Sequence, residues 1–161
     1  MKADNPIKHF VLAFFLALVC YLGFYHWIEH RRARKGPWQV TFTNDLAGVP
    51  EMIINQPALR LTNIELSFPG QSITNRNVFG TLSFSQPRPV PYEVGFATCL
   101  FMDTTFLPGT LTFRIFGHEI ELLPRTMIID HEERPWSPGQ TIKLPPAGTT
   151  TVLDERRHPG Q

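Results

Sequence analysis

The chain has 161 residues, of which 15 are Lys or Arg and 14 are Asp or Glu, and its formal net charge is +1. This near-neutral balance lacks the basic excess typical of nucleic-acid-binding surfaces, so we expect no nucleic-acid partner. The two cysteines predict no disulfide framework. Because no complete Cys-x-x-Cys, Gly-x-Ser-x-Gly, phosphate-loop or dinucleotide-binding motif occurs, we predict neither an enzyme nor a bound cofactor.

Residues 10–30 are predicted to form a single transmembrane helix, after a short N-terminal tail at residues 1–9. Phe10 to Ile28 is a run of 19 residues without Asp, Glu, Lys or Arg. A helix of that length spans about 28 Å, close to the hydrocarbon thickness of a bilayer. Signal cleavage is one alternative, but it requires small residues before the cut, and none follows a short apolar core here. Lipidation at Cys20 is the other, but Val19 stands where a small residue is required. A retained anchor is therefore predicted.

Two sets of side chains on this anchor have expected roles. Small residues at helical spacing allow a second helix to approach closely, which predicts a helix-packing stripe of Ala13, Ala17 and Cys20. Aromatic and basic residues at the end of a span are typical of interfacial anchoring. That set comprises Tyr25, His26, Trp27, Arg31, Arg32, Arg34 and Lys35. The anchor could also contact a pigment or a lipid.

The basic residues after the anchor bear on which side the rest of the chain faces. Residues 31–37 are predicted to be a basic juxtamembrane linker that lies against anionic lipid head groups. They carry more positive charge than Lys2 and Lys8 before the span. This excess favours a cytoplasmic location for the following domain, in an inner membrane of bacterial type. A periplasmic domain is the alternative, because short-tailed bacterial single-pass proteins often export theirs.

Residues 38–144 are predicted to form an all-β sandwich, immunoglobulin-like or jelly-roll-like, of eight or nine short strands, followed by a flexible tail at residues 145–161. The chain contains 13 Phe, 15 Pro and 11 Gly, and no segment after Lys35 has a sustained helical period. Apolar and polar residues alternate from Trp38 to Thr43, as on a half-buried strand. Most Phe side chains are expected to fill the core of the sandwich.

Later segments of the domain give more specific expectations. Tyr92 to Met102 is apolar on both alternating faces, which predicts one central strand buried on both sides. Phe116-Gly117 lies between two alternating segments and predicts a hairpin in which Gly117 adopts a positive φ. Phe101, Phe106 and Leu107 lie among turn-forming residues and are candidates for a docking loop. These three side chains either insert beneath their own strands or contact a partner or the bilayer.

Several polar side chains could bind metal or take part in catalysis. His26 and His30, four residues apart on one helix face, are candidate metal or haem ligands, with interfacial anchoring as the alternative. Asp130 and His131 are further metal candidates, although adjacent ligands seldom converge and a solvated turn is predicted over residues 130–133. Glu119 and Glu121, at residues 118–121 after the hairpin turn, are expected to form an exposed polar face rather than an acid–base pair. Cys99 is expected to be buried.

The sequence therefore indicates location and architecture more strongly than chemistry. The favoured function is a non-catalytic accessory subunit of a larger membrane protein complex, of respiratory or photosynthetic type, that stabilises the assembly through its β domain. Its expected partners are integral membrane protein subunits and the lipid bilayer. An assembly factor or metallochaperone for such a complex is the alternative, and a membrane-tethered enzyme is the third hypothesis.

Overall fold

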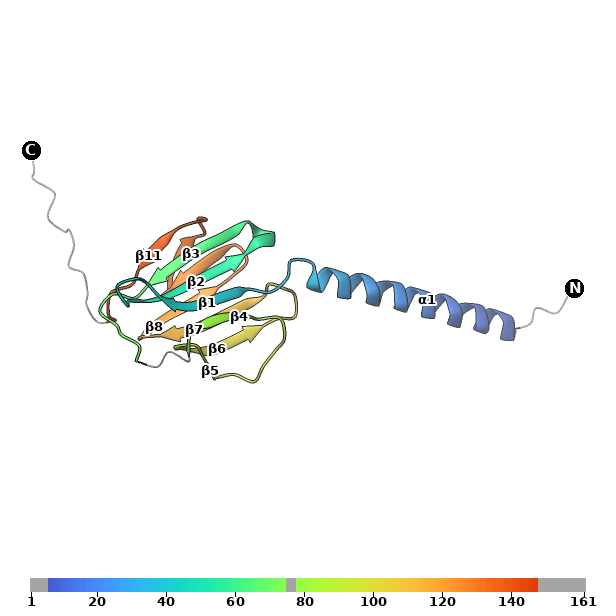
Figure 1. Cartoon of the computed structure of the whole chain (residues 1–161). Helices are drawn as coiled ribbons and strands as arrows, with labels where there is room; N and C mark the ends of the chain where they lie inside the picture. The colour runs from blue at the N-terminus through green and yellow to red at the C-terminus, as the bar shows by residue number, and fades with distance from the viewer. Residues whose placement is uncertain (1–5, 75–77, 148–161) are drawn as a thin grey trace, which may run out of the picture.

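A computed structural model describes residues 6–74 and 78–147 of the chain. One long helix, α1 (Pro6–Ala33), projects from one end of two β-sheets (Figure 1). None of its 28 residues is buried against the described part of the chain. By length and composition α1 could cross a membrane. The helix begins before the apolar run and continues beyond it, so that Arg31 and Arg32 are helical.

Two mostly antiparallel sheets follow the helix and face each other, consistent with a β-sandwich; together with their loops we call them the β domain. The first sheet, in the order β11-β3-β2-β1-β4, is formed by Thr141–Lys143, Leu61–Ser67, Pro50–Gln56, Gln39–Asn44 and Gly80–Ser83. The second, in the order β10-β9-β8-β7-β6-β5, is formed by Glu132–Pro135, Thr126–Ile129, His118–Leu122, Thr110–Ile115, Ala97–Asp103 and Tyr92–Val94. A short 3₁₀ helix, η1 (Pro57–Leu59), joins β2 to β3. The pairing of β11 with β3 is parallel, unlike the others.

The described residues form eleven strands rather than eight or nine, and the largest difference is in the segment from Tyr92 to Met102. The prediction of one central strand there was wrong. The segment is a hairpin of β5 and β6, and β5 is the edge strand of the second sheet. Gly95 has a φ of 59°, which allows the chain to reverse between the two strands. A Cβ at Gly95 would lie 2.4 Å from Phe42, so the turn also depends on the absence of a side chain.

A β-bulge in β6 changes which side chains face the core. Cys99 is buried, and strict alternation would place Phe101 on the same side. The register between β6 and β7 shifts between Cys99 and Phe101, so that Met102 packs against the core instead. Phe101 is consequently exposed, and it belongs to a strand rather than to the loop expected around it.

Aromatic side chains fill the space between the sheets, as predicted. Trp38, Phe42, Phe68 and Phe113 are almost completely buried. Phe96 packs edge-on against Phe42, with a centroid distance of 5.0 Å, and the Phe84 and Phe113 rings are 5.5 Å apart. Edge-on aromatic pairs of this kind stabilise a core beyond the area they bury. The alternation in β1 places Val40 and Phe42 inward as expected.

The segments on either side of the β domain are attached to it. The Gln56 side chain is 1% exposed, and its Nε2 donates hydrogen bonds to the carbonyl oxygens of Gly36 and Pro37, at 3.0 and 2.9 Å. These bonds hold the connection between α1 and β1. At the other end, the Pro145 carbonyl accepts a hydrogen bond from His118. The remainder of the predicted tail, from residue 148, lies outside the described residues.

Candidate functional site

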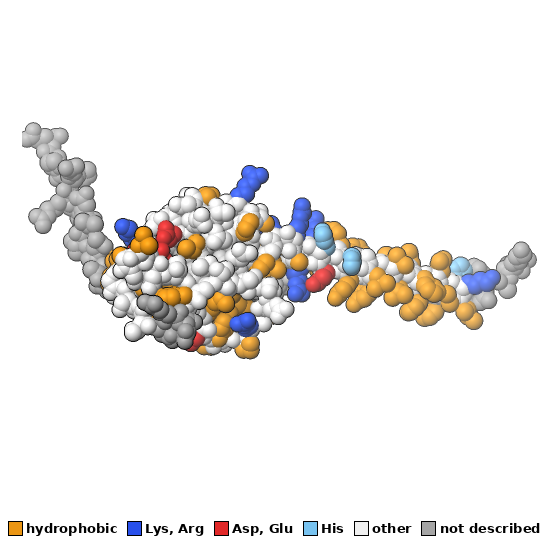
Figure 2. All heavy atoms as spheres, viewed as in Figure 1, with side chains coloured by type: hydrophobic (Ala, Val, Ile, Leu, Met, Phe, Trp, Pro, Cys, Tyr) orange, Lys and Arg blue, Asp and Glu red, His pale blue; other side chains and the backbone are white. Residues whose placement is uncertain are grey.

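The surface of α1 is apolar along most of its length, with Lys and Arg side chains gathered where the helix meets the β domain (Figure 2). Ala13, Ala17 and Cys20 are all exposed on this helix. A shallow groove of about 370 Å³ is lined by Cys20, Gly23, Phe24 and Trp27. The groove continues the stripe of small residues by one turn, because Gly23 has no side chain and nothing lies within 4 Å of its missing Cβ.

The aromatic and basic residues at the end of α1 contact one another. The Arg31 guanidinium carbon lies 4.2 Å from the centroid of the Trp27 ring, within range of a cation–π interaction. The Tyr21 and Tyr25 rings are stacked, and Arg32 forms an ion pair with Glu29 at 3.7 Å. This end of the helix therefore presents organised aromatic and cationic groups. Their interfacial role stays a prediction.

The loop between β6 and β7 lies directly against this end of the helix. The Leu107 N–H donates a hydrogen bond to the Arg32 carbonyl at 2.8 Å. The last carbonyls of a helix lack partners within it, and here a loop from the β domain satisfies one of them. Phe106 is exposed, whereas Leu107 is partly buried. Of the three residues predicted to dock, Phe106 and Leu107 are thus together beside the helix, and Phe101 is separate from them on β6.

Several bonds hold this loop in one conformation. Trp38 Nε1 donates to the Gly109 carbonyl at 3.0 Å, and Asp103 Oδ1 accepts from the Thr105 N–H at 2.9 Å. Hydrogen bonds from Thr105 lower the pKa of Asp103 despite the opposing effect of its slight burial, so the carboxylate form is favoured. Gly109 has a φ of 75°, and a Cβ there would lie 1.9 Å from the Asp103 carbonyl oxygen. Only glycine fits this position.

A cavity of about 500 Å³ lies at the junction of α1 and the β domain, and we call it the junction pocket. It is lined by Arg31, Arg34, Lys35, Phe106, Leu107, Pro108 and Pro124. One wall is cationic and comes from the last turn of α1 and the residues after it. The other wall is apolar and comes from the β6–β7 loop and from the loop between β8 and β9. This combination of a basic wall and an apolar wall was not predicted from the sequence.

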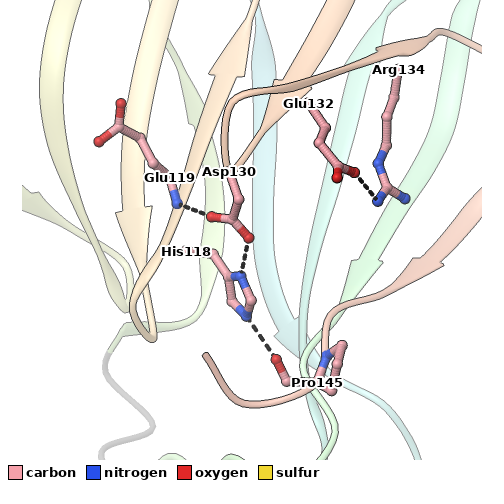
Figure 3. Close-up of polar contacts among 6 residues, drawn as sticks. All are labelled: His118, Glu119, Asp130, Glu132, Arg134 and Pro145. Carbon is pink, nitrogen blue, oxygen red and sulfur yellow. Dashed lines mark hydrogen bonds and ion pairs between the residues drawn. The ribbon is translucent and has the colours of Figure 1, made fainter. Parts of the chain in front are cut away.

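Several polar groups of the second sheet form hydrogen bonds or ion pairs (Figure 3). His118 Nδ1 lies 2.6 Å from Asp130 Oδ2, and His118 Nε2 lies 2.8 Å from the Pro145 carbonyl oxygen. Asp130 Oδ1 also accepts from the Glu119 N–H at 2.9 Å. Partial burial would raise the pKa of Asp130, but the hydrogen bonds from His118 and Glu119 and the nearby histidines outweigh it and lower that pKa.

The metal candidates do not converge in the described part of the chain. No group of three or more His, Cys, Asp or Glu side chains occurs there with a geometry that could hold a metal. Asp130 and His131 form the two-residue turn between β9 and β10, both with positive φ, and the Asp130 carboxylate faces His118. His26 and His30 are exposed on α1. Glu132, beyond the turn, contacts Arg134 at 3.3 Å.

The remaining candidates for catalysis, Glu119, Glu121 and Cys99, lie at positions typical of residues with a structural role. Glu119 and Glu121 alternate with the buried Ile120 on β8, on the outer face of the sheet as the alternation predicted, but both are half-buried rather than exposed. Cys99 is buried, and this burial raises the pKa of its thiol, which suppresses the reactive thiolate. Burial beside Cys99 likewise raises the pKa of Tyr92 to about 12.

Two features of these sites were missed from the sequence. His118 occupies an inward position of β8, and its alternation with Ile120 and Leu122 would have indicated burial and hence a need for polar partners. Gly23 extends the small-residue stripe on α1 and was likewise not predicted.

The chain matches no protein-family model, and no curated protein or solved structure is significantly similar to it.

Proposed function

We propose that α1 crosses a membrane once and that the protein is a non-catalytic accessory subunit of a larger membrane protein complex, of respiratory or photosynthetic type. The observation that carries the proposal is the helix itself. It has 28 residues, its surface is apolar along most of its length (Figure 2), and the described part of the chain buries none of it. An apolar surface of this extent needs lipid or protein around it.

The groove on α1 supports the proposal that another protein helix lies beside α1 within the bilayer. Helices in lipid associate through close packing, and small residues allow their backbones to approach. Ala13, Ala17 and Cys20 form such a face, which the groove at Gly23 continues. We infer that this face packs against a helix of a partner subunit. The β domain then lies at the membrane surface, where it stabilises the assembly.

The polar groups of the β domain support a structural role rather than a catalytic one. His118 and Asp130 are bonded to each other and to the backbone. The Cys99 thiol is buried with a raised pKa. Groups that satisfy each other in this way stabilise a fold but do not present a free nucleophile or base to a substrate.

The basic residues after α1 favour a cytoplasmic β domain, in an inner membrane of bacterial type, because Lys and Arg beside a span resist translocation. The test is the accessibility of a tag placed after Gln161 in intact and permeabilised cells. Protection in intact cells supports the proposed side, and labelling without permeabilisation supports a periplasmic domain instead.

The subunit role is tested by extraction of native membranes. Alkaline carbonate should leave the full chain in the membrane, and mild detergent should release it together with partner subunits at a fixed ratio. Release by carbonate would contradict the anchor. Absence from the mature complex, with association only during assembly, would instead support the assembly factor or metallochaperone, and metal analysis of the isolated protein would separate these two.

A further inference from the structure

The junction pocket combines a cationic surface with an apolar one. Arg31, Arg34 and Lys35 line it from the helix side, and Phe106 and Leu107 line it from the β6–β7 loop. Phe106 is 58% exposed, although it is a large apolar side chain. A ligand that fits must therefore present an anionic group beside an apolar one.

The positive charges that line the pocket are not neutralised by nearby carboxylates in the described part of the chain. Arg32 pairs with Glu29, but within the described residues no carboxylate pairs with Arg31, Arg34 or Lys35. Arg31 is instead placed by its contact with the Trp27 ring. Three cations at one pocket, without carboxylate partners, attract an anion such as a phosphodiester.

The pocket is also held in shape before any ligand arrives. The bond from the Leu107 N–H to the Arg32 carbonyl joins the two walls, and the Trp38–Gly109 bond fixes the base of the loop. A site that is already organised loses little conformational entropy when it binds. Its position at the end of the apolar helix, one turn beyond Trp27, corresponds to head-group depth if α1 spans the bilayer.

We propose that the junction pocket binds an anionic phospholipid, with the head-group phosphate at Arg31, Arg34 and Lys35 and the glycerol end of the acyl chains against Phe106 and Leu107. This inference rests on the proposed membrane anchoring by α1. It assigns the exposed Phe106 a lipid contact, and it makes the β6–β7 loop part of the lipid interface rather than a protein-docking surface.

The test is a titration of the full chain, in non-ionic detergent, with phosphatidylglycerol or phosphatidylcholine, in which native mass spectrometry measures the binding of single lipids. The wild-type protein should bind phosphatidylglycerol more tightly. Arg34→Gln combined with Lys35→Gln should weaken that binding about fivefold for each cation removed, or roughly 25-fold for the pair. The matched control is Arg114→Gln with Lys143→Gln, which removes two cations from exposed positions outside the pocket and should leave the lipid preference unchanged.

A second variant tests the contribution of the apolar wall to lipid binding. Phe106→Asp should also weaken binding of phosphatidylglycerol, whereas Leu46→Asp, in the fully exposed turn between β1 and β2, should not. Equal affinity of the wild-type protein for the two lipids, or equal losses in the paired variants and their controls, would overturn the lipid site. Carbonate extraction distinguishes failure of the lipid site from failure of the membrane anchor. A protein that stays in the membrane but shows no lipid preference refutes the lipid site alone.

Discussion

His118 and Asp130 are 12 residues apart in the sequence, yet their side chains meet at 2.6 Å. The other ring nitrogen of His118 faces the Pro145 carbonyl, which can only accept, so Nε2 carries a proton. The lowered pKa of Asp130 favours the carboxylate, which faces His118 Nδ1. His118 thus joins the β9–β10 turn to the segment that follows β11.

His118→Ala should lower the free energy of unfolding by about 1.5–3 kcal/mol, since hydrogen bonds to charged groups contribute that much. The lowered pKa of Asp130 stabilises the fold above its ordinary value of 3.8, and this contribution is lost as pH falls through the folded pKa. The variant should therefore lose less stability on acidification. Chemical denaturation of the full chain in mild detergent measures both effects. His131→Asn, at the exposed neighbouring position, is the control: it removes only the weakest of the contributions to the pKa of Asp130 and should change stability little.

The helix and the hairpin at Phe116–Gly117 could be predicted because their signals are local. An uncharged run long enough to span a bilayer indicates a helix, and a glycine between two alternating segments indicates a turn. Both residues of that turn have positive φ, at 50° and 90°. The Phe-rich core followed from the same alternation.

The features that could not be predicted depend on tertiary contacts. The turn at Gly95 lies within an apolar segment that gives no other turn signal. A glycine is required there because the Phe42 ring lies where a Cβ would be. The bulge after Cys99 reverses the alternation without any change in residue type. The junction pocket brings together Lys35 and Phe106, which are far apart in the sequence, and the Leu107–Arg32 bond helps to hold their two segments side by side.

A fragment beginning at Gly36 should fold without α1, because the two sheets supply their own core. We expect a β-type circular dichroism spectrum and a cooperative thermal transition. Within this fragment, Phe113→Ala should lower the free energy of unfolding by about 3–5 kcal/mol, since the ring is fully buried. A largely helical spectrum, or a loss below about 1 kcal/mol, would be inconsistent with this core.

Glu51 should make stability depend on pH near neutrality. Burial, its hydrogen bond to Glu65 and the like charges of Glu65 and Asp45 raise its pKa from 4.5 to about 7. A raised pKa stabilises the fold below the unfolded value, and this contribution is lost as pH rises through the folded one. Stability should therefore fall between about pH 4.5 and 7. Thermal melts of Glu51→Gln across this range should show a smaller fall, and a curve identical to wild type would contradict the assignment.

Gly109→Ala should disturb the loop that forms the apolar wall of the junction pocket. A positive φ costs a residue with a Cβ about 1–3 kcal/mol, and here the new Cβ would also meet the Asp103 carbonyl oxygen. The loop must shift, which breaks the bond from Trp38. Gly139→Ala is the matched control, because Gly139 has a φ of 70° but nothing within 4 Å of the added atom. Denaturation midpoints should fall more for Gly109→Ala, and equal shifts would show that the close contact has no effect.

The last prediction concerns how α1 holds its proposed partner. Ala17→Leu and Gly23→Leu both place a larger side chain on the stripe of small residues, and nothing in the described part of the chain lies within 4 Å of a Cβ at Gly23. The helix stays apolar, so membrane insertion should be unchanged. Close approach of a second helix should be prevented, because contact between helices in lipid depends on small residues at the interface.

The measurement is the fraction of protein retained with the complex after mild detergent extraction. Leu18→Ala, beside the stripe on the helix surface, is the control and should behave as wild type. Loss of retention in the two stripe variants alone would make α1 part of the subunit interface. Equal retention in all three variants would show that the stripe makes no essential contact. The outer surfaces of the β domain would then hold the protein to its complex, and the proposed role of α1 would be reduced to anchoring.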